Sequence, residues 1–244
     1  MARMDEIVPL PAQGRVFGHG FVAGLADAAP SGRVRFDALA RWLQDVAHAD
    51  VRDARFSERS IWVIRRTRLC VARFPRLEEE VIVRTFASGL GRAWAQRRTS
   101  IVTAGGGAVE GVTLWVHLDP RDGRPAPLSA EEIAVYEPST GGRTINARLR
   151  HPAPPPDAVS RSWTFRSAEL DLGDHINNVA SWTALEEELL AGPEPEALDV
   201  EVEYRTPAQP GPHEVLSAGP RRWIVAPDGE VRTSILLGAT GSLS

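Results

Sequence analysis

Apolar residues recur along the first half of the chain in two different periods. They are first spaced three and four residues apart, which predicts one face of a helix, and the positions are Phe36, Leu39, Leu43 and Val46. Alternating runs typical of strands then follow, and they cover 61–71, 81–88, 94–103 and 108–117. Glycine and proline breaks between these runs are typical of hairpin turns. The pattern predicts one helix followed by an antiparallel meander.

The second half repeats this order. A strand is predicted at 162–166, and a helix is predicted from Ile176, to be ended by Gly192-Pro193. Four further strands are expected around 200–204, 214–218, 221–225 and 231–237. Asp174, Asn177 and Asn178 are all suitable cap residues, so the helix is expected to begin within a few residues of His175.

A proline-rich segment separates the halves. It ends at 151–156 and is too stiff to join a sheet, so we predict one domain at 1–150, with a linker at its end, and a second at 157–244. An offset of 142 residues aligns the two predicted helix starts and sets Val34 against Ile176. The same offset sets Ala29 against Asp171 and Arg33 against His175. If the halves arose by duplication, only the second keeps the acid and the imidazole.

The candidate chemistry lies in one short string, Asp171 to Asn178. It holds a carboxylate and an imidazole four residues apart, on a turn that contains Gly173 and leads into the predicted helix. Unpaired N–H groups at a helix start can stabilise a carbonyl oxygen that becomes negative during attack. The alternative is structural, because Asp and Asn are common caps and glycine is common in turns.

Composition narrows the class of protein. With 244 residues, 43% hydrophobic and 25% charged, the chain suits one large globular domain or two of about 120 residues. A net charge of −4 with mixed signs argues against a nucleic-acid binder, and Arg65-Arg66 and Arg97-Arg98 are expected on solvated strand faces. The single cysteine, Cys70, excludes an internal disulfide and is expected to be a buried thiol. Without a signal-peptide or membrane-spanning pattern, a cytoplasmic location is expected.

Other chemistry-bearing residues favour structural roles. Trp62, Trp94 and Trp115 are expected in the core, although a ligand tunnel could also use them. His117 and His213 lack acidic or cysteine partners at ligand spacing, so no zinc is expected.

A helix wrapped by a curved antiparallel sheet, occurring twice, predicts an α+β fold of two tandem hotdog domains. The chain resembles the acyl-acyl-carrier-protein thioesterases of plants and bacteria over most of positions 15–240. The Asp-Leu-x-x-His-Ile-Asn-Asn string and the following strand, Val202-Glu203-Tyr204-Arg205, carry the resemblance in the second half. First-half strings in the family's order are Ile61-Trp62-Val63 with Arg65, Arg73-Phe74-Pro75, Gly91-Arg92 with Arg97-Arg98, and Leu114-Trp115-Val116.

The resemblance implies hydrolysis of a fatty acyl thioester on acyl carrier protein, with coenzyme A as the open alternative and with no cofactor or metal. It assigns catalysis to Asp171, His175 and Asn177, and substrate binding to Asn178 and Gly173. Asp171 would activate water or, less favourably, act as nucleophile. His175 would orient the water or the carboxylate, or protonate the leaving thiolate, and N–H groups near Asn177 and Asn178 would stabilise the oxyanion. The first domain would bind the acyl chain.

Three positions depart from the plant enzymes. Gly173 replaces an asparagine, and Pro207 and Ala208 replace an acid and a cysteine. Glu201 and Glu203 could substitute for the missing acid, although alternating strand residues more often face water. Two alternatives therefore stay open: a hotdog hydratase or dehydratase acting on enoyl or hydroxyacyl thioesters, and a non-catalytic acyl-thioester-binding protein. The expected assembly is a monomer or a homodimer, and neither nucleic acid nor a membrane span is expected.

Overall fold

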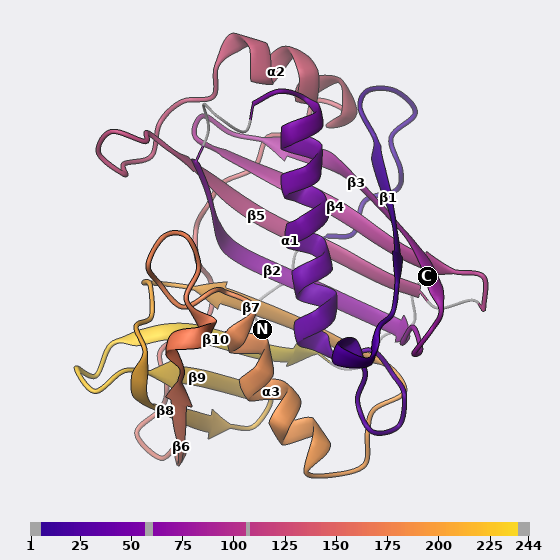
Figure 1. Ribbon diagram of the computed structural model, residues 1–244. Coiled ribbons are helices and arrows are strands. Elements are labelled where there is room, and N and C mark those ends of the chain that lie inside the picture. The colour runs from indigo at the N-terminus through magenta and orange to yellow at the C-terminus, as the bar shows by residue number, and fades with distance from the viewer. Residues whose placement is uncertain (1–5, 57–60, 106–107, 239–244) are drawn as a thin grey trace.

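One continuous antiparallel sheet organises the molecule (Figure 1). The computed structural model describes residues 6–56, 61–105 and 108–238. The strands follow the order β1-β3-β4-β5-β2-β7-β10-β9-β8-β6. Their bounds are β1 Phe17–Val22, β2 Ile61–Arg73, β3 Glu80–Leu90, β4 Trp94–Thr103, β5 Ala108–Leu118, β6 Val159–Phe165, β7 Leu198–Tyr204, β8 Gly211–Ala218, β9 Arg221–Val225 and β10 Val231–Gly238. The helices are α1 Phe36–Asp53, α2 Ala130–Tyr136 and α3 Ala180–Leu190.

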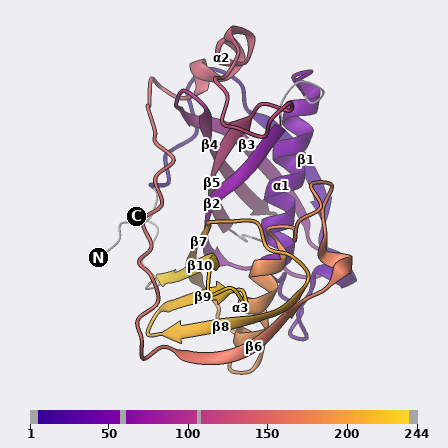
Figure 2. The same ribbon diagram turned by 90° about the vertical axis from the view of Figure 1, so that its left-hand side faces the viewer.

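The long helices α1 and α3 lie on the same, concave face of the sheet (Figures 1 and 2). The apolar stripe of α1 presses closely on β5, where Gly111 leaves room for Leu43: a Cβ at Gly111 would lie 2.5 Å from Leu43 Cδ2. Strands β2 and β7 then pair across the two halves, with Thr67 opposite Val202. The sheet therefore joins two helix-and-sheet units edge to edge.

Both units also share one hydrophobic core. Phe36 at the start of α1 stacks on Trp182 of α3, with ring centroids 5.8 Å apart. Leu69 of β2 and Val200 of β7 are fully buried in the same cluster. The prediction of two tandem helix-and-sheet units is thus confirmed, while β1 and α2 were not predicted because their short segments carry little periodicity.

The predicted offset of 142 residues is confirmed in the backbone that precedes each long helix. A 3₁₀ turn at Leu25–Asp27 corresponds to one at Ser167–Glu169, and the bridge between Ala28 and Val34 corresponds to that between Leu170 and Ile176. Corresponding N–H groups also donate to corresponding carbonyls in the two turns. Because separate local accidents would not reproduce this set of bonds, the turns are two copies of one structural unit.

The linker after α2 crosses the convex face of the sheet, opposite the helices (Figure 2). It forms no strand between 145 and 158, as its prolines predicted, yet it is closely bound. Trp94 Nε1 donates to Ile145 O at 2.7 Å, and Trp223 Nε1 donates to Pro152 O at 2.9 Å. These bonds fix the linker at both ends of its path.

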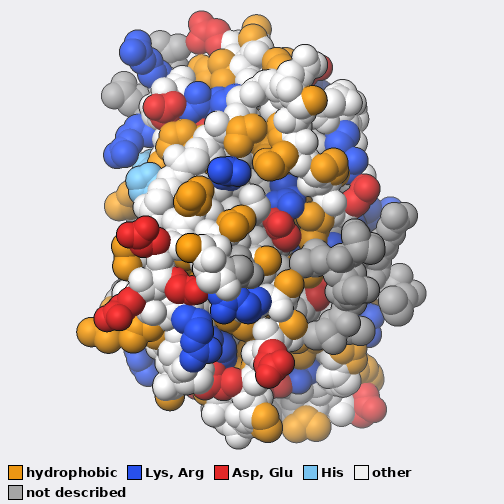
Figure 3. All heavy atoms as spheres, turned by 90° about the vertical axis from the view of Figure 1, so that its right-hand side faces the viewer, with side chains coloured by type: hydrophobic (Ala, Val, Ile, Leu, Met, Phe, Trp, Pro, Cys, Tyr) orange, Lys and Arg blue, Asp and Glu red, His pale blue; other side chains and the backbone are white. Residues whose placement is uncertain are grey.

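The prediction of water-facing charges was wrong at the covered parts of the sheet. Arg66, Arg97 and Arg98 are all buried, and Glu201 and Glu203 are fully buried. The chain contains no lysine, and the planar, weakly hydrated guanidinium of arginine suits buried ion pairs. On the face shown in Figure 3, basic and acidic side chains are interspersed, in keeping with the small net charge.

Two further expectations concern the burial of the single thiol and the absence of a membrane-spanning pattern. Cys70 is a buried free thiol, as predicted, and burial raises its pKa. Among the described residues, no helix has the length and apolar character needed to cross a membrane.

Candidate active site

The string from Asp171 to Asn178 forms a tight turn that is closed by backbone hydrogen bonds. Asp171 N donates to His175 O at 2.9 Å, and Asp174 N donates to Asp171 O at 3.1 Å. Asp174 adopts a positive φ of 57°, a conformation that Asp tolerates better than most residues. Asp174 therefore shapes the turn rather than capping the helix.

The side chains of Asp171 and His175 lie on the exposed outer part of this turn. Gly173 N donates to Asp171 Oδ1 at 2.8 Å and so fixes the carboxylate. A Cβ built at Gly173 would lie 3.2 Å from Asp171 Oδ1 and 3.6 Å from His175 Nδ1. The turn thus brings the carboxylate and the imidazole to the same glycine, and within the described residues no hydrogen bond joins their side chains.

The helix after the turn begins later than predicted. It starts at Ala180, not near Ile176, because Asn177 Oδ1 accepts from Val179 N and Asn177 O accepts from Ala180 N. The N–H of Asn177 donates to Glu169 O at 2.8 Å, so that group is already occupied. The N–H of Asn178 has no partner in the described part of the chain, and it is the better placed of the two for an oxyanion.

Positions 207 and 208 lie beside the turn. Ala208 O accepts from Ile176 N at 2.9 Å, while Pro207 is exposed. Neither supplies an acid or a thiol. Glu201 and Glu203 cannot replace them, because they point to the convex face while Val200 and Val202 face the helices.

The equivalent turn of the first half is occupied by buried ion pairs. Arg33, at the position that corresponds to His175, forms a buried ion pair with Glu186 of α3 at 2.6 Å and a second pair with Glu194 at 2.5 Å. The other oxygen of Glu186 accepts from Phe36 N at the start of α1. Of the two copies of the turn, only the one at Asp171 exposes the side chains at both corresponding positions, because Ala29 and Arg33 are buried.

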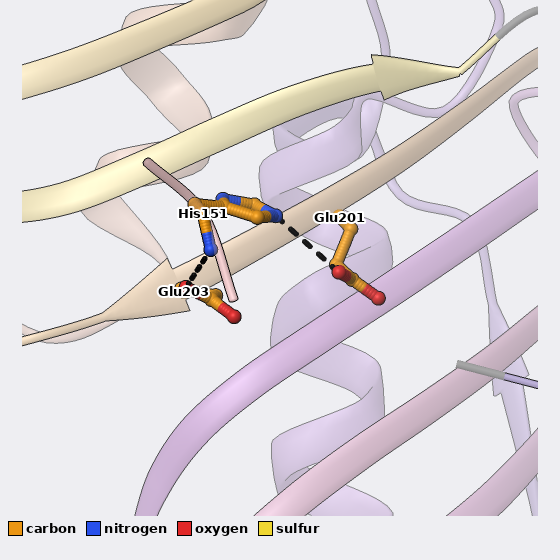
Figure 4. A group of neighbouring side chains, drawn as sticks. All are labelled: His151, Glu201 and Glu203. Carbon is orange, nitrogen blue, oxygen red and sulfur yellow. Dashed lines mark hydrogen bonds and ion pairs between the residues drawn. The ribbon is translucent and has the colours of Figure 1, made fainter. Parts of the chain in front are cut away.

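A buried cluster on the convex face was not predicted as a site. His151, Glu201 and Glu203 offer ligand atoms that lie within 4.8 Å of one another (Figure 4). However, Arg66 lies 4.0 Å from Glu201 and 3.7 Å from Glu203, and Glu203 also accepts from two linker N–H groups. The carboxylates thus already have a cation and donors, and the cluster fastens the linker to β2 and β7.

A mainly apolar cavity of about 150 Å³ lies in the first half. It is lined by α1, by the concave face of β2–β5 and by the segment that includes α2. The lining residues are Ala47, His48, Val51, Trp62, Ala87, Ala95, Arg97, Trp115, Leu128 and Tyr136. Three of these are alanines, whose small side chains leave the space open.

Comparison with known families settles the class of protein. Residues 14–136, half of the chain, match the model of the acyl-ACP thioesterase N-terminal domain. The chain belongs to the acyl-ACP thioesterase family. This thioesterase hydrolyses fatty acyl thioesters, so the predicted enzyme class is confirmed in preference to the hydratase and the non-catalytic alternatives.

Relatives of the thioesterase support the same fold over nearly its whole length. Two uncharacterized proteins from strains of Mycobacterium tuberculosis are each 24% identical over 207 residues, covering 84% of this chain and 83% of theirs. An acyl-ACP thioesterase from Bacteroides thetaiotaomicron superposes with a TM-score of 0.76 at 17% identity, covering 91% of this chain and 96% of the other. A 12:0-ACP thioesterase from Umbellularia californica gives 0.72 at 18% identity, with coverages of 92% and 97%. The tandem hotdog fold is thereby confirmed.

Proposed function

We propose that this thioesterase releases fatty acid from acyl carrier protein at the Asp171 turn. The observation that carries the proposal is the open turn, where an exposed carboxylate and an exposed imidazole meet at Gly173. The corresponding turn of the first half offers Ala29 and a sealed Arg33 instead. The family's substrate, an acyl group on acyl carrier protein, supplies the thioester.

The proposed chemistry is a single attack by water. Asp171 accepts a proton as the water oxygen bonds to the thioester carbon. The N–H of Asn178 stabilises the negative carbonyl oxygen, and the carbon–sulfur bond then breaks as the oxyanion collapses. The departing sulfur takes up the proton that Asp171 accepted, either through His175 as the donor or directly, in which case His175 orients the water. The products are the fatty acid and the free thiol of the carrier.

The acyl chain is assigned to the first-half cavity. Its wall is mainly apolar, and Ala47, Ala87 and Ala95 keep it open, which suits the methylene groups of a fatty acyl chain. The two halves would then divide the work, because one binds the chain while the other provides the reacting groups.

The test compares the same acyl group on two thiols. Purified full-length protein is incubated with lauroyl and palmitoyl thioesters of acyl carrier protein and of coenzyme A, and the released thiol is measured. We expect a higher kcat/KM with the carrier protein for at least one chain length. A higher kcat/KM with coenzyme A at both lengths would reject the carrier assignment, and no thiol release from any substrate would reject the hydrolytic site.

His175→Ala is expected to lower kcat by about 10²-fold, the lower end of the contribution of a side chain that transfers a proton or positions the water. The matched control is His19→Ala, another exposed histidine, which lies on the edge strand β1. Steady-state thiol release checks both variants. Equal kcat values for His175→Ala and the unaltered protein would return His175 to a structural role.

A further inference from the structure

The wall of the first-half cavity contains polar atoms that have no hydrogen-bond partner in the described structure. Two lining residues carry such atoms, Trp115 Nε1 and Tyr136 Oη. Thr113 Oγ1 and His117 Nε2, on either side of Trp115 in β5, are also buried and unpartnered. Four unpartnered polar atoms therefore lie on the cavity wall or on the two β5 residues that flank Trp115.

The register of the sheet explains how these groups come together. Gly111 of β5 faces Leu43 of α1, so the alternation of the strand turns Thr113, Trp115 and His117 toward the same concave side. Trp115 is opposite Ala95 of β4, a residue of the cavity wall. His117 contacts Trp62, another wall residue, with ring centroids 5.0 Å apart.

Tyr136 approaches the same cavity from α2. Its ring lies beside Arg97, whose guanidinium carbon is 5.6 Å from the ring centroid. Arg97 is itself ion-paired with the buried Asp50. Burial raises the pKa of Tyr136 to about 12, so the phenol keeps its proton, and with the Arg97 guanidinium beside it the hydroxyl is best suited to donate to a ligand.

An unsubstituted hydrocarbon chain would leave all four groups unpaired. Each buried polar group without a partner is unfavourable, and four of them beside one cavity point to a ligand that carries its own polar group. The histidine narrows the chemistry of that ligand. His117 Nδ1 lies 2.9 Å from Ala126 O; because a carbonyl only accepts, the neutral ring carries its proton on Nδ1 and leaves Nε2 as an acceptor.

A hydroxyl group on the acyl chain can form hydrogen bonds with more of these four polar atoms than a ketone can. It can donate to His117 Nε2 and accept from Trp115 Nε1, whereas a ketone can only accept. Thr113 can donate or accept, and Tyr136 can donate. We propose that the cavity selects acyl chains that carry a hydroxyl group along the chain, in preference to unsubstituted chains of the same length. This inference rests on the proposed placement of the acyl chain in the cavity.

The first experiment compares matched substrates with the unaltered, full-length protein. Dodecanoyl and hexadecanoyl thioesters of acyl carrier protein are assayed beside versions that carry one hydroxyl at successive carbons. We expect kcat/KM to be about tenfold higher for at least one hydroxylated chain, the scale of one well-formed hydrogen bond to a buried group. Equal or lower values at every hydroxyl position would overturn the inference and leave the hydrolytic function intact.

The two tyrosines of the chain provide matched variants. Tyr136→Phe removes one unpartnered oxygen and is expected to reduce the hydroxyl preference several-fold, as is Thr113→Val. Tyr204→Phe is the control, because the buried Tyr204 oxygen already accepts from Trp182 Nε1 at 2.8 Å. An unchanged preference in both Tyr136→Phe and Thr113→Val would also overturn the inference.

Calorimetric binding of the free acids separates the two proposals. Tighter binding of a hydroxylated fatty acid than of its unsubstituted parent would support the inference even if no thioester were hydrolysed. Equal binding of the two acids would overturn the hydroxyl preference alone, and failure of both acids to bind would overturn the chain assignment as well.

Discussion

Asp171→Asn is expected to lower kcat for acyl thioester hydrolysis by about 10²- to 10⁴-fold, the usual contribution of a general base. The substitution keeps an oxygen that can accept from Gly173 N, the bond that fixes the turn at 2.8 Å. It removes only the basic carboxylate. The loss of activity should therefore occur in a protein that folds and melts like the original.

Thiol release and a thermal melt, measured on the same preparation, check this result. Asp174→Asn is the control, because Asp174 is exposed on the same turn and asparagine also tolerates its positive φ. We expect the control to retain nearly full turnover. If Asp171→Asn does so as well, Asp171 serves only to build the turn.

Glu203→Ala is expected to lower the free energy of unfolding by about 3–5 kcal/mol, the typical cost of removing one partner from a buried ion pair. Glu203 is fully buried and accepts from Arg150 N at 2.6 Å and from His151 N at 2.9 Å. Arg66 lies 3.7 Å away. Removal of the carboxylate would leave a buried guanidinium and two backbone donors without this partner.

Urea unfolding followed by tryptophan fluorescence measures this loss, and Glu214→Ala on β8 is the control because Glu214 is exposed. The control is expected to change stability by less than about 0.5 kcal/mol. A similarly small change for Glu203→Ala would mean that water replaces the carboxylate on an open linker.

The elements that could be predicted were those whose apolar residues recur with a regular local period. The stripe of Phe36, Leu39 and Leu43 located α1, and the alternating runs located β2–β5. The offset of 142 residues depended on a few matched positions, such as Val34 and Ile176, and the backbone bonds confirm it.

The burial of strand residues under a distant segment of the chain could not be predicted from the alternation of apolar and polar residues. Glu201 and Glu203 alternate with apolar residues as water-facing residues do, yet a linker 50 to 53 positions earlier in the chain lies over them. A strand pattern records which side of the sheet a residue faces but not what lies there. Arg66 was misassigned for the same reason.

The candidate site was recognisable from its residues but not from its periodicity. Asp171 and His175 stand out because an acid and an imidazole share one turn, whereas the start of α3 was misplaced because Asn177 forms a tight turn before the helix. Of the three polar residues of β5 beside the cavity, Trp115 was expected in the core, His117 was considered only as a zinc ligand, and Thr113 was not singled out. Only their common alternation in β5 could have indicated a shared face.

The ion pair of Arg33 with Glu186 in the first turn gives the proposed function a defined stoichiometry. A symmetric pair of single hotdog units would present two identical turns, but this chain presents one. Titration of the enzyme with a slowly hydrolysed acyl thioester should therefore reach saturation at one equivalent per 244-residue chain. The corresponding position of the first half, Arg33, has a structural role instead, because its partner Glu186 of α3 also accepts from Phe36 N at the start of α1.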